Sequence, residues 1–246
     1  MLRNSQIIYG IRTILEAIES GTDFHKIFLQ KGVKSPLFMA LERQIHNLKI
    51  PHSYVPEERL KRITTHNHQG AIAEISEVSY AKFEETIEHI LLAKEYPMFL
   101  LLDGLTDVRN FGAILRTASC AGVDAVIVPK QGMAPLNKDA IKTSAGAAFI
   151  LPVARVDHLK DAVYYLRSSG VQIISATEKA EKHVYDVDFK KASAIIMGSE
   201  DVGIHSSLLK LSDIQAKLPI IGAIESLNVS VACGAFLFEM ARQRLN

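Results

Sequence analysis

The second part of the chain alternates short apolar runs with helix-length segments, and this alternation restricts the folds open to it. Five runs have the length of a strand: Met98–Asp103, Ala125–Val128, Val171–Ala176, Ala194–Met197 and Ile214–Leu218. Helices are expected between most of them, over Phe111–Ala121, His158–Ser168, His205–Lys210 and Asn228–Arg244. Apolar strands separated by helices predict a parallel sheet covered on both faces. Ligands of such sheets bind at the carboxyl ends of the strands.

Residues 1–80 have a different pattern and predict a small α/β domain. Strands are expected over Lys26–Gln30, His52–Val55 and Ala71–Ile75, and helices over Ile11–Ser20, Ser35–Asn47 and Glu57–Ile63. Residues 81–97 are rich in Glu and end in Tyr96-Pro97, which is typical of an amphipathic connecting helix. We therefore expect a first domain over 1–80, a linker helix over 81–97 and a second domain over 98–246.

Composition excludes some classes of protein. Of 246 residues, 48% are hydrophobic, which is enough for a proper core and excludes a wholly disordered chain. The formal net charge is only +1, so the chain is not a generally basic nucleic-acid coat protein. Residues 1–80 hold ten Lys and Arg against eight Asp and Glu. Any contact with RNA must therefore come from local patches.

The cysteines and the apolar segments predict a soluble cytoplasmic protein. Cys120 and Cys233 are far apart and lack C-x-x-C spacing, so we expect two buried, reduced thiols. The first residues lack a signal-peptide pattern, and the apolar stretch Leu227–Phe238 is too short to span a bilayer. His66 and His68 form an H-x-H pair, but a third metal ligand is missing, and a turn at Gly70 is the better interpretation.

Three short motifs follow strand ends, where a ligand site is expected. They are Asn110-Phe-Gly-Ala-Ile-Leu-Arg116, Met197-Gly-Ser-Glu-Asp-Val-Gly203 and Ser226-Leu-Asn-Val-Ser230. Taken one at a time, each has a structural explanation: Asn110 and Asn228 as helix caps, and the glycine loop as an ordinary turn. Capped helices also present free N–H groups to a ligand, so a binding site is the second interpretation of the motifs.

Together and in this order, the three motifs resemble those of the SpoU (TrmH-type) branch of the SPOUT methyltransferases. His68-Gln69-Gly70 and Tyr9-Gly10 are similar to the N-terminal module of the ribosomal-RNA members. The resemblance implies a C-terminal α/β domain whose sheet is mostly parallel and whose chain threads a trefoil knot, after an L30e-like RNA-binding domain. It also implies a homodimer, S-adenosylmethionine as cofactor, and no metal.

The resemblance carries functional roles onto residues of this chain. The catalytic positions are Asn110, Arg116, Glu200, Ser226 and Asn228. The cofactor positions are Thr177, Glu178, Gly198, Ser199, Gly203, Leu218, Ile220 and Leu227. Ser144, in a segment of small residues, is a candidate for the substrate pocket, although close helix packing explains that segment as well. For Arg116 we expect a bidentate grip on an RNA phosphate, because arginine keeps its proton in proteins.

The expected activity is methyl transfer from S-adenosylmethionine to the ribose 2′-hydroxyl of a guanosine in large-subunit ribosomal RNA. Two alternatives remain open. One is the same reaction on a tRNA ribose, and the other is a non-catalytic RNA-binding factor in ribosome assembly. The presence of Asn110, Arg116 and Glu200 argues against the second.

Overall fold

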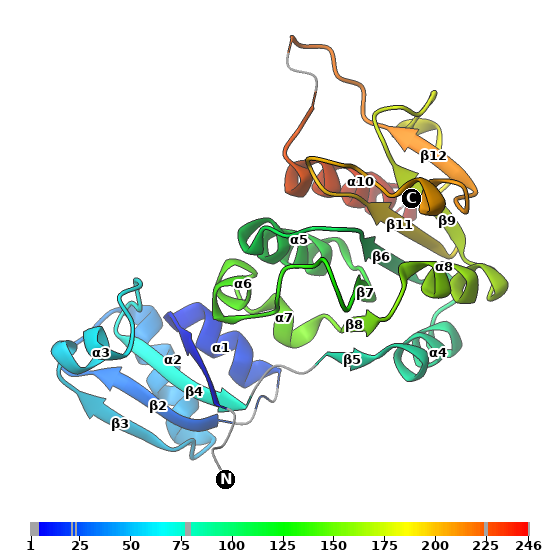
Figure 1. Cartoon of the computed structure of the whole chain (residues 1–246). Helices are drawn as coiled ribbons and strands as arrows, with labels where there is room; N and C mark the ends of the chain where they lie inside the picture. Colours follow the sequence, from blue (N-terminus) through cyan, green and yellow to red (C-terminus); the bar gives the residue numbers. More distant parts are fainter. Residues whose placement is uncertain (1–4, 21, 23, 77–79, 224–225, 246) are drawn as a thin grey trace. The chain divides into compact units, whose positions relative to one another are not determined.

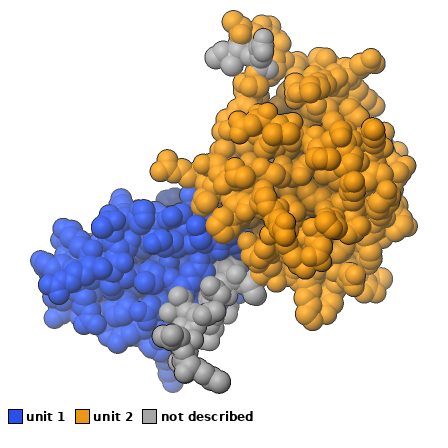
Figure 2. Space-filling model, in the orientation of Figure 1, with its two compact units in different colours: residues 1–79, 136–150 blue, residues 80–135, 151–246 orange. Residues whose placement is uncertain are grey.

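A computed structural model describes the chain except for residues 1–4, 21, 23, 77–79, 224–225 and 246. The chain divides into two compact units (Figure 2). Unit 1 consists of Met1–Ser79 and Leu136–Ile150, and unit 2 consists of Tyr80–Pro135 and Leu151–Asn246. Residues 136–150 thus group with the N-terminal residues, although they lie between two strands of unit 2 in the sequence.

Unit 1 is built on a mixed four-stranded sheet with the order β1-β4-β2-β3. The strands are β1 (Ser5–Tyr9), β2 (Phe24–Gln30), β3 (His52–Val55) and β4 (Ala71–Ser76). The helices are α1 (Ile11–Glu19), α2 (Pro36–Asn47), α3 (Glu57–Ile63), α6 (Lys138–Thr143) and α7 (Ala147–Ile150). β4 pairs antiparallel with β1 and β2, whereas β3 pairs parallel with β2 and forms an edge of the sheet.

The His-Gln-Gly sequence before β4 joins that strand to the start of α1. The Gly70 N–H donates to Nδ1 of the buried His68 over 3.0 Å, and the Ile11 N–H donates to Oε1 of Gln69 over 3.3 Å. Gly70 has a φ of +85°, and a Cβ there would lie 3.2 Å from the side chain of Val33. The structure therefore explains why His, Gln and Gly stand at positions 68–70, and the predicted turn at Gly70 is confirmed.

Unit 2 contains an eight-stranded sheet with the order β10-β12-β9-β11-β6-β7-β8-β5, and all of its pairings are parallel. The strands are β5 (Ala81–Lys82), β6 (Met98–Leu102), β7 (Ala125–Pro129), β8 (Val153–Val156), β9 (Gln172–Ala176), β10 (Lys182–His183), β11 (Ser193–Met197) and β12 (Ile214–Lys217). The helices are α4 (Phe83–Ala93), α5 (Val108–Ala121), α8 (Leu159–Ser168), the 3₁₀ turn η1 (Val184–Asp186), α9 (Ser206–Leu209) and α10 (Val229–Arg244). The predicted parallel sheet is confirmed.

Helices cover both faces of this sheet (Figure 1). On one face, α4, α8 and α9 share a buried cluster with Phe99 and Leu101 of β6. The alternate residues Leu100 and Leu102 are buried too, and α5 packs against α10. Successive side chains of a strand point to opposite faces, so β6 is covered on both. The threading of the chain through a trefoil knot stays a prediction.

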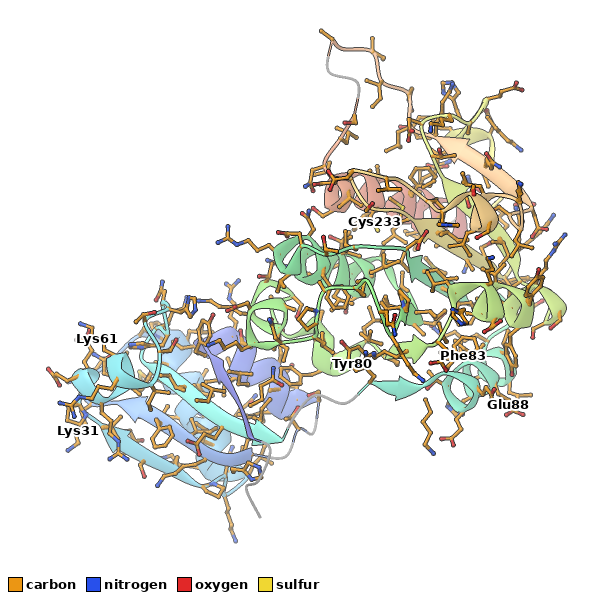
Figure 3. All side chains as sticks on the ribbon, viewed as in Figure 1. Lys31, Lys61, Tyr80, Phe83, Glu88 and Cys233 are labelled. Atoms are coloured by element: carbon orange, nitrogen blue, oxygen red, sulfur yellow. The ribbon has the colours of Figure 1, made fainter. Side chains whose placement is uncertain are left out.

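The two cysteines differ in exposure. Cys233 is fully buried in α10, and burial raises its pKa to about 12 (Figure 3). Cys120 is exposed near the end of α5, so the expectation of two buried thiols is wrong for this residue. Its position at the last turn of α5 turns the side chain away from the apolar face of that helix. Within the described parts of the chain, every helix is too short or too polar to cross a bilayer.

Candidate active site

The first motif lies at the start of α5, with a different cap from the one expected. The helix begins at Val108, and its N-cap is Asp107, whose carboxylate accepts a 2.7 Å hydrogen bond from the Asn110 N–H. The prediction that Asn110 itself caps the helix is therefore wrong, because Asp107 is an equally good cap three residues earlier. The side chain of Asn110 does not serve its own helix end and instead reaches a neighbouring loop.

Side chains from the three motifs meet in one hydrogen-bonded cluster. Oε1 of Glu200 accepts from Nδ2 of Asn228 over 2.6 Å and from Nδ2 of Asn110 over 3.3 Å. It also accepts from the Val229 N–H over 3.1 Å, and Nδ2 of Asn228 donates to Oδ1 of Asn110 over 3.1 Å. Residues 90 and 28 positions away in the chain thus converge on one carboxylate.

The N-terminus of α10 holds two members of this cluster in place. Asn228 is the N-cap of α10, and its Oδ1 accepts from the Ser230 N–H over 3.0 Å, which confirms the predicted cap. Glu200 lies against the first N–H of the same helix, where a negative charge is favourable. The carboxylate, Asn110 and Asn228 are exposed or half-buried, so the cluster faces solvent and a ligand can reach it.

The glycine loop after β11 folds back on itself so closely that it needs glycine. Ser199 and Gly203 form an antiparallel bridge, and the Gly203 N–H donates to the Ser199 carbonyl over 3.0 Å. A Cβ on Gly198 would lie 2.1 Å from the carbonyl carbon of Gly203. Gly203 has a φ of +73°, a backbone conformation that favours glycine. This turn holds Glu200 at its tip, directed toward Asn228.

Six of the predicted residues line a single cavity beside the cluster. They are Thr177, Glu178, Leu218, Ile220, Ser226 and Leu227. Ser226, expected among the catalytic residues, therefore lies with the expected cofactor residues. Gly198, Ser199 and Gly203 are not part of the lining, and they shape the adjoining loop.

Five further residues of the lining were not predicted: Ala176, Met197, Lys217, Ala232 and Phe236. Ala176, Met197 and Lys217 are the last residues of β9, β11 and β12, so the rule that ligands bind at strand ends could have found them. Ala232 and Phe236 are four residues apart on α10 and share one face of it. The cavity thus has mostly apolar walls, with Glu178 as its carboxylate and Lys217 as its ammonium group.

Two predicted residues lie apart from this arrangement. Arg116 is exposed on α5, two turns after Asn110, and the described hydrogen bonds and ion pairs do not join it to the Glu200 cluster. Ser144 belongs to unit 1 and is buried, and its hydroxyl donates to the Ile141 carbonyl over 2.7 Å. Ser144 therefore serves local helix packing. In the described ranges, His, Cys, Asp and Glu side chains nowhere gather in a group that could hold a metal ion.

Comparisons with known proteins identify families that match both parts of the chain. Residues 97–238 match the family described as SpoU rRNA Methylase, and residues 7–81 match the one described as RNA 2′-O ribose methyltransferase substrate binding. The chain is 35% identical to the 23S rRNA (guanosine-2′-O-)-methyltransferase RlmB of Pseudomonas aeruginosa, over 96% of both chains.

Two further relatives extend the comparison. A putative TrmH family tRNA/rRNA methyltransferase of Staphylococcus epidermidis is 32% identical, over 97% of this chain and 96% of that protein. The crystal structure of an AdoMet-bound rRNA methyltransferase from Sinorhizobium meliloti superposes with a TM-score of 0.80. That structure is 24% identical and covers 98% of this chain and 88% of its own, so it bears on the fold alone.

Proposed function

The chain belongs to the SpoU rRNA Methylase family, and we propose that it transfers a methyl group from S-adenosylmethionine to the ribose 2′-hydroxyl of a guanosine in large-subunit ribosomal RNA. The observation that carries this proposal is the Glu200 cluster. It joins the motif on α5, the glycine loop and the cap of α10 beside a cavity that suits a nucleoside cofactor.

The lining of the cavity is compatible with S-adenosylmethionine. Apolar side chains such as Leu218, Leu227 and Phe236 offer contact area for an adenine ring, and we assign the ring to Leu227. Glu178 and Lys217 are opposite charges in the same lining, and they match the ammonium and carboxylate groups of a methionine tail. When bound, S-adenosylmethionine supplies a methyl group that its sulfonium has already activated.

The protein residues then have positioning roles. Glu200 holds the amides of Asn110 and Asn228 through Oε1, which fixes their orientation before any RNA arrives. We assign the ribose 2′-hydroxyl to this group, with Oε2 of Glu200 as the acceptor of its hydrogen bond. Arg116, exposed on the same helix as Asn110, grips a phosphate of the target nucleotide.

The choice of ribosomal RNA rests on the full-length likeness to proteins named for that substrate. A tRNA ribose is the second candidate, because relatives at 32% identity are named for tRNA and rRNA together. A methyl-transfer assay distinguishes the two candidates. The purified protein is given labelled S-adenosylmethionine and either ribosomal RNA or bulk tRNA as the acceptor. We expect label on a guanosine ribose of large-subunit RNA. Label on tRNA alone supports the second candidate. The absence of label on both acceptors contradicts the proposal that the protein is an RNA methyltransferase.

We also propose that the protein acts in the cytoplasm as a homodimer. Val231 and Phe238 of α10 and Leu245 at its C-cap are exposed apolar residues spaced seven apart, so they form one stripe. A second copy of the same helix region would cover this stripe. Sedimentation should give a dimer, and Phe238→Glu should give a monomer. A monomeric parent protein would contradict the proposal.

A further inference from the structure

Unit 1 carries a group of rings at the edge of its sheet, of which His46 and Tyr54 are exposed and His52 is half-buried. The rings of His46 and His52 meet edge to face with centroids 4.8 Å apart, and those of His52 and Tyr54 do so at 5.8 Å. His46 lies in the last turn of α2, while His52 and Tyr54 are two residues apart on the edge strand β3 and share one face of it. We name these three residues the ring surface.

The ring surface is held in place and open to solvent. Nδ1–H of His52 donates to the Ile50 carbonyl over 2.9 Å, and the Tyr54 hydroxyl donates to Oε1 of Glu42 over 2.8 Å. His46 is exposed, and Tyr54 is 41% exposed. Two large apolar side chains of the same helix region are exposed too: Met39 on α2 is 52% exposed, and Leu48, the C-cap of α2, is 60% exposed.

Positive charge concentrates in the same part of unit 1. Residues 31–55, which include α2 and β3, hold the four cations Lys31, Lys34, Arg43 and Lys49 and the single carboxylate of Glu42. That carboxylate is already occupied by the Tyr54 hydroxyl. The rest of residues 1–80 holds six cations and seven carboxylates, so the excess of the domain lies here. Lys31, directly after β2, is exposed (Figure 3). Arg43 on α2 is exposed too.

We propose that unpaired nucleobases of the RNA substrate stack on the ring surface formed by His46, His52 and Tyr54. Bases carry a π-face whatever their sequence, and aromatic side chains amid cations bind single-stranded segments in this way. The cations would contact the phosphates on either side of the stacked bases. The proposal rests on the proposed function for the identity of the partner as RNA. It adds which part of unit 1 binds that RNA, and in which state of pairing.

Comparing the binding of unpaired loop RNA with the binding of paired RNA distinguishes base stacking from simple charge attraction, because both RNAs carry phosphates but only the loop has free bases. The probes are a hairpin with an unpaired purine-rich loop and a blunt duplex of the same length, and the readout is the Kd of the full-length protein. Tyr54→Leu and His46→Leu should each weaken hairpin binding roughly 5- to 100-fold, with little change for the duplex. Tyr54→Phe keeps the ring and should bind like the parent. Tyr164→Leu is the control, since Tyr164 is an exposed tyrosine of unit 2.

The outcomes that overturn the inference are distinct. Parent-like hairpin affinity in Tyr54→Leu, or an equal loss for both probes, shows that bases do not stack there. A change in sedimentation of the leucine variants without a change in Kd shows that the surface contacts protein instead. Unfolding midpoints check that the variants fold. Methyl transfer is measured separately: a parent protein that binds hairpins through the rings but transfers no methyl group contradicts the proposed function and leaves this inference standing.

Discussion

The absence of a side chain at Gly198 shapes the loop that presents Glu200. A Cβ there would overlap the backbone of Gly203, so Gly198→Ala must open the turn. Overpacking of this kind costs about 1–3 kcal/mol, and the displaced loop borders the cofactor cavity. We expect calorimetry to show S-adenosylmethionine affinity reduced about tenfold or more. Gly222→Ala is the matched control, because a Cβ at Gly222 meets open space. Unchanged affinity in Gly198→Ala would remove this loop from the cofactor site.

Arg116 allows a test of its role, because a phosphate grip and a general base predict different behaviour. Arg116→Lys keeps the charge but loses the bidentate fork, so a phosphate role predicts roughly tenfold weaker RNA binding. Turnover should remain measurable, and cofactor affinity should not change. Lysine releases its proton more readily than arginine, so a base role predicts activity that recovers as pH rises. Single-turnover rates of Arg116→Lys, measured against pH, decide between the two roles. If the rate recovers at alkaline pH and the RNA affinity equals that of the parent, the phosphate role is contradicted.

His68 predicts an acid-sensitive step in the stability of unit 1. Burial lowers the pKa of His68 below its ordinary 6.5, nearby Glu57 opposes this, and Lys61 and Lys142 add to it. Its Nδ1 accepts the Gly70 N–H, which requires the neutral ring. Because the folded pKa is depressed, the stabilisation is complete above about pH 6.5 and is lost as pH falls toward the folded pKa.

The matched variant is His68→Asn, whose side-chain oxygen can accept the same hydrogen bond but does not titrate. When the pH is lowered from about 7.5 to about 5.5, the unfolding midpoint of the parent should fall further than that of His68→Asn. Equal slopes for the parent and His68→Asn would show that His68 does not carry the effect.

At the scale of elements, the cap of α5 couples helix stability to the orientation of Asn110. Asp107→Ala should cost about 1 kcal/mol of stability, the usual value for a lost cap. It should also lower turnover by roughly tenfold or more, because Asn110 loses its fixed position. Cofactor affinity should not change. Asn137→Ala removes the equivalent cap of α6 in unit 1 and should lower stability alone. Parent turnover in Asp107→Ala would mean that the cap does not orient the site.

Long periodic segments could be predicted from the sequence, whereas short ones could not. The strands near 98–103 and 194–197 are continuous apolar runs, and both form. β5 and β10 have only two residues each, which is too short for a period to emerge, and they exist because neighbouring strands pair with them. The four-residue β8 was missed as well, although β3 and β12, which have the same length, were predicted. The cap of α5 was misplaced because Asp107 and Asn110 are both good caps, and only the fold chooses between them.

The same limit applies to the candidate site. Resemblance brought Asn110, Glu200 and Asn228 together, and their hydrogen bonds agree with that grouping. Lys217 and Phe236 of the cavity carry no motif of their own, because they qualify only through their position at a strand end and on a helix face. His46, His52 and Tyr54 were equally hidden, since the sequence separates His46 from the other two by a loop.

At the scale of the whole molecule, we propose that the two units divide the work. The cofactor cavity and the Glu200 cluster are built from unit 2 alone, while the ring surface and its cations belong to unit 1. A chain that begins at residue 80 should therefore keep its affinity for S-adenosylmethionine and lose most of its affinity for ribosomal RNA. Residues 136–150 lose their partners in this variant, but they contribute nothing to the cavity lining.

The stability of the shortened chain should depend on the residue at which it begins, so a second shortened chain is compared with the first. Residues 81–97 were expected to be a linker helix, yet Ile87 of α4 is fully buried in the cluster with α8 and the sheet. A chain that begins at residue 95 lacks α4, and exposing that core should cost several kcal/mol, as other large deletions from cores do. It should unfold at a lower temperature than the chain from residue 80. Cofactor calorimetry, RNA binding and thermal unfolding on both chains test the division. Parent RNA affinity in the chain from residue 80 would show that unit 1 is not the part that binds the substrate.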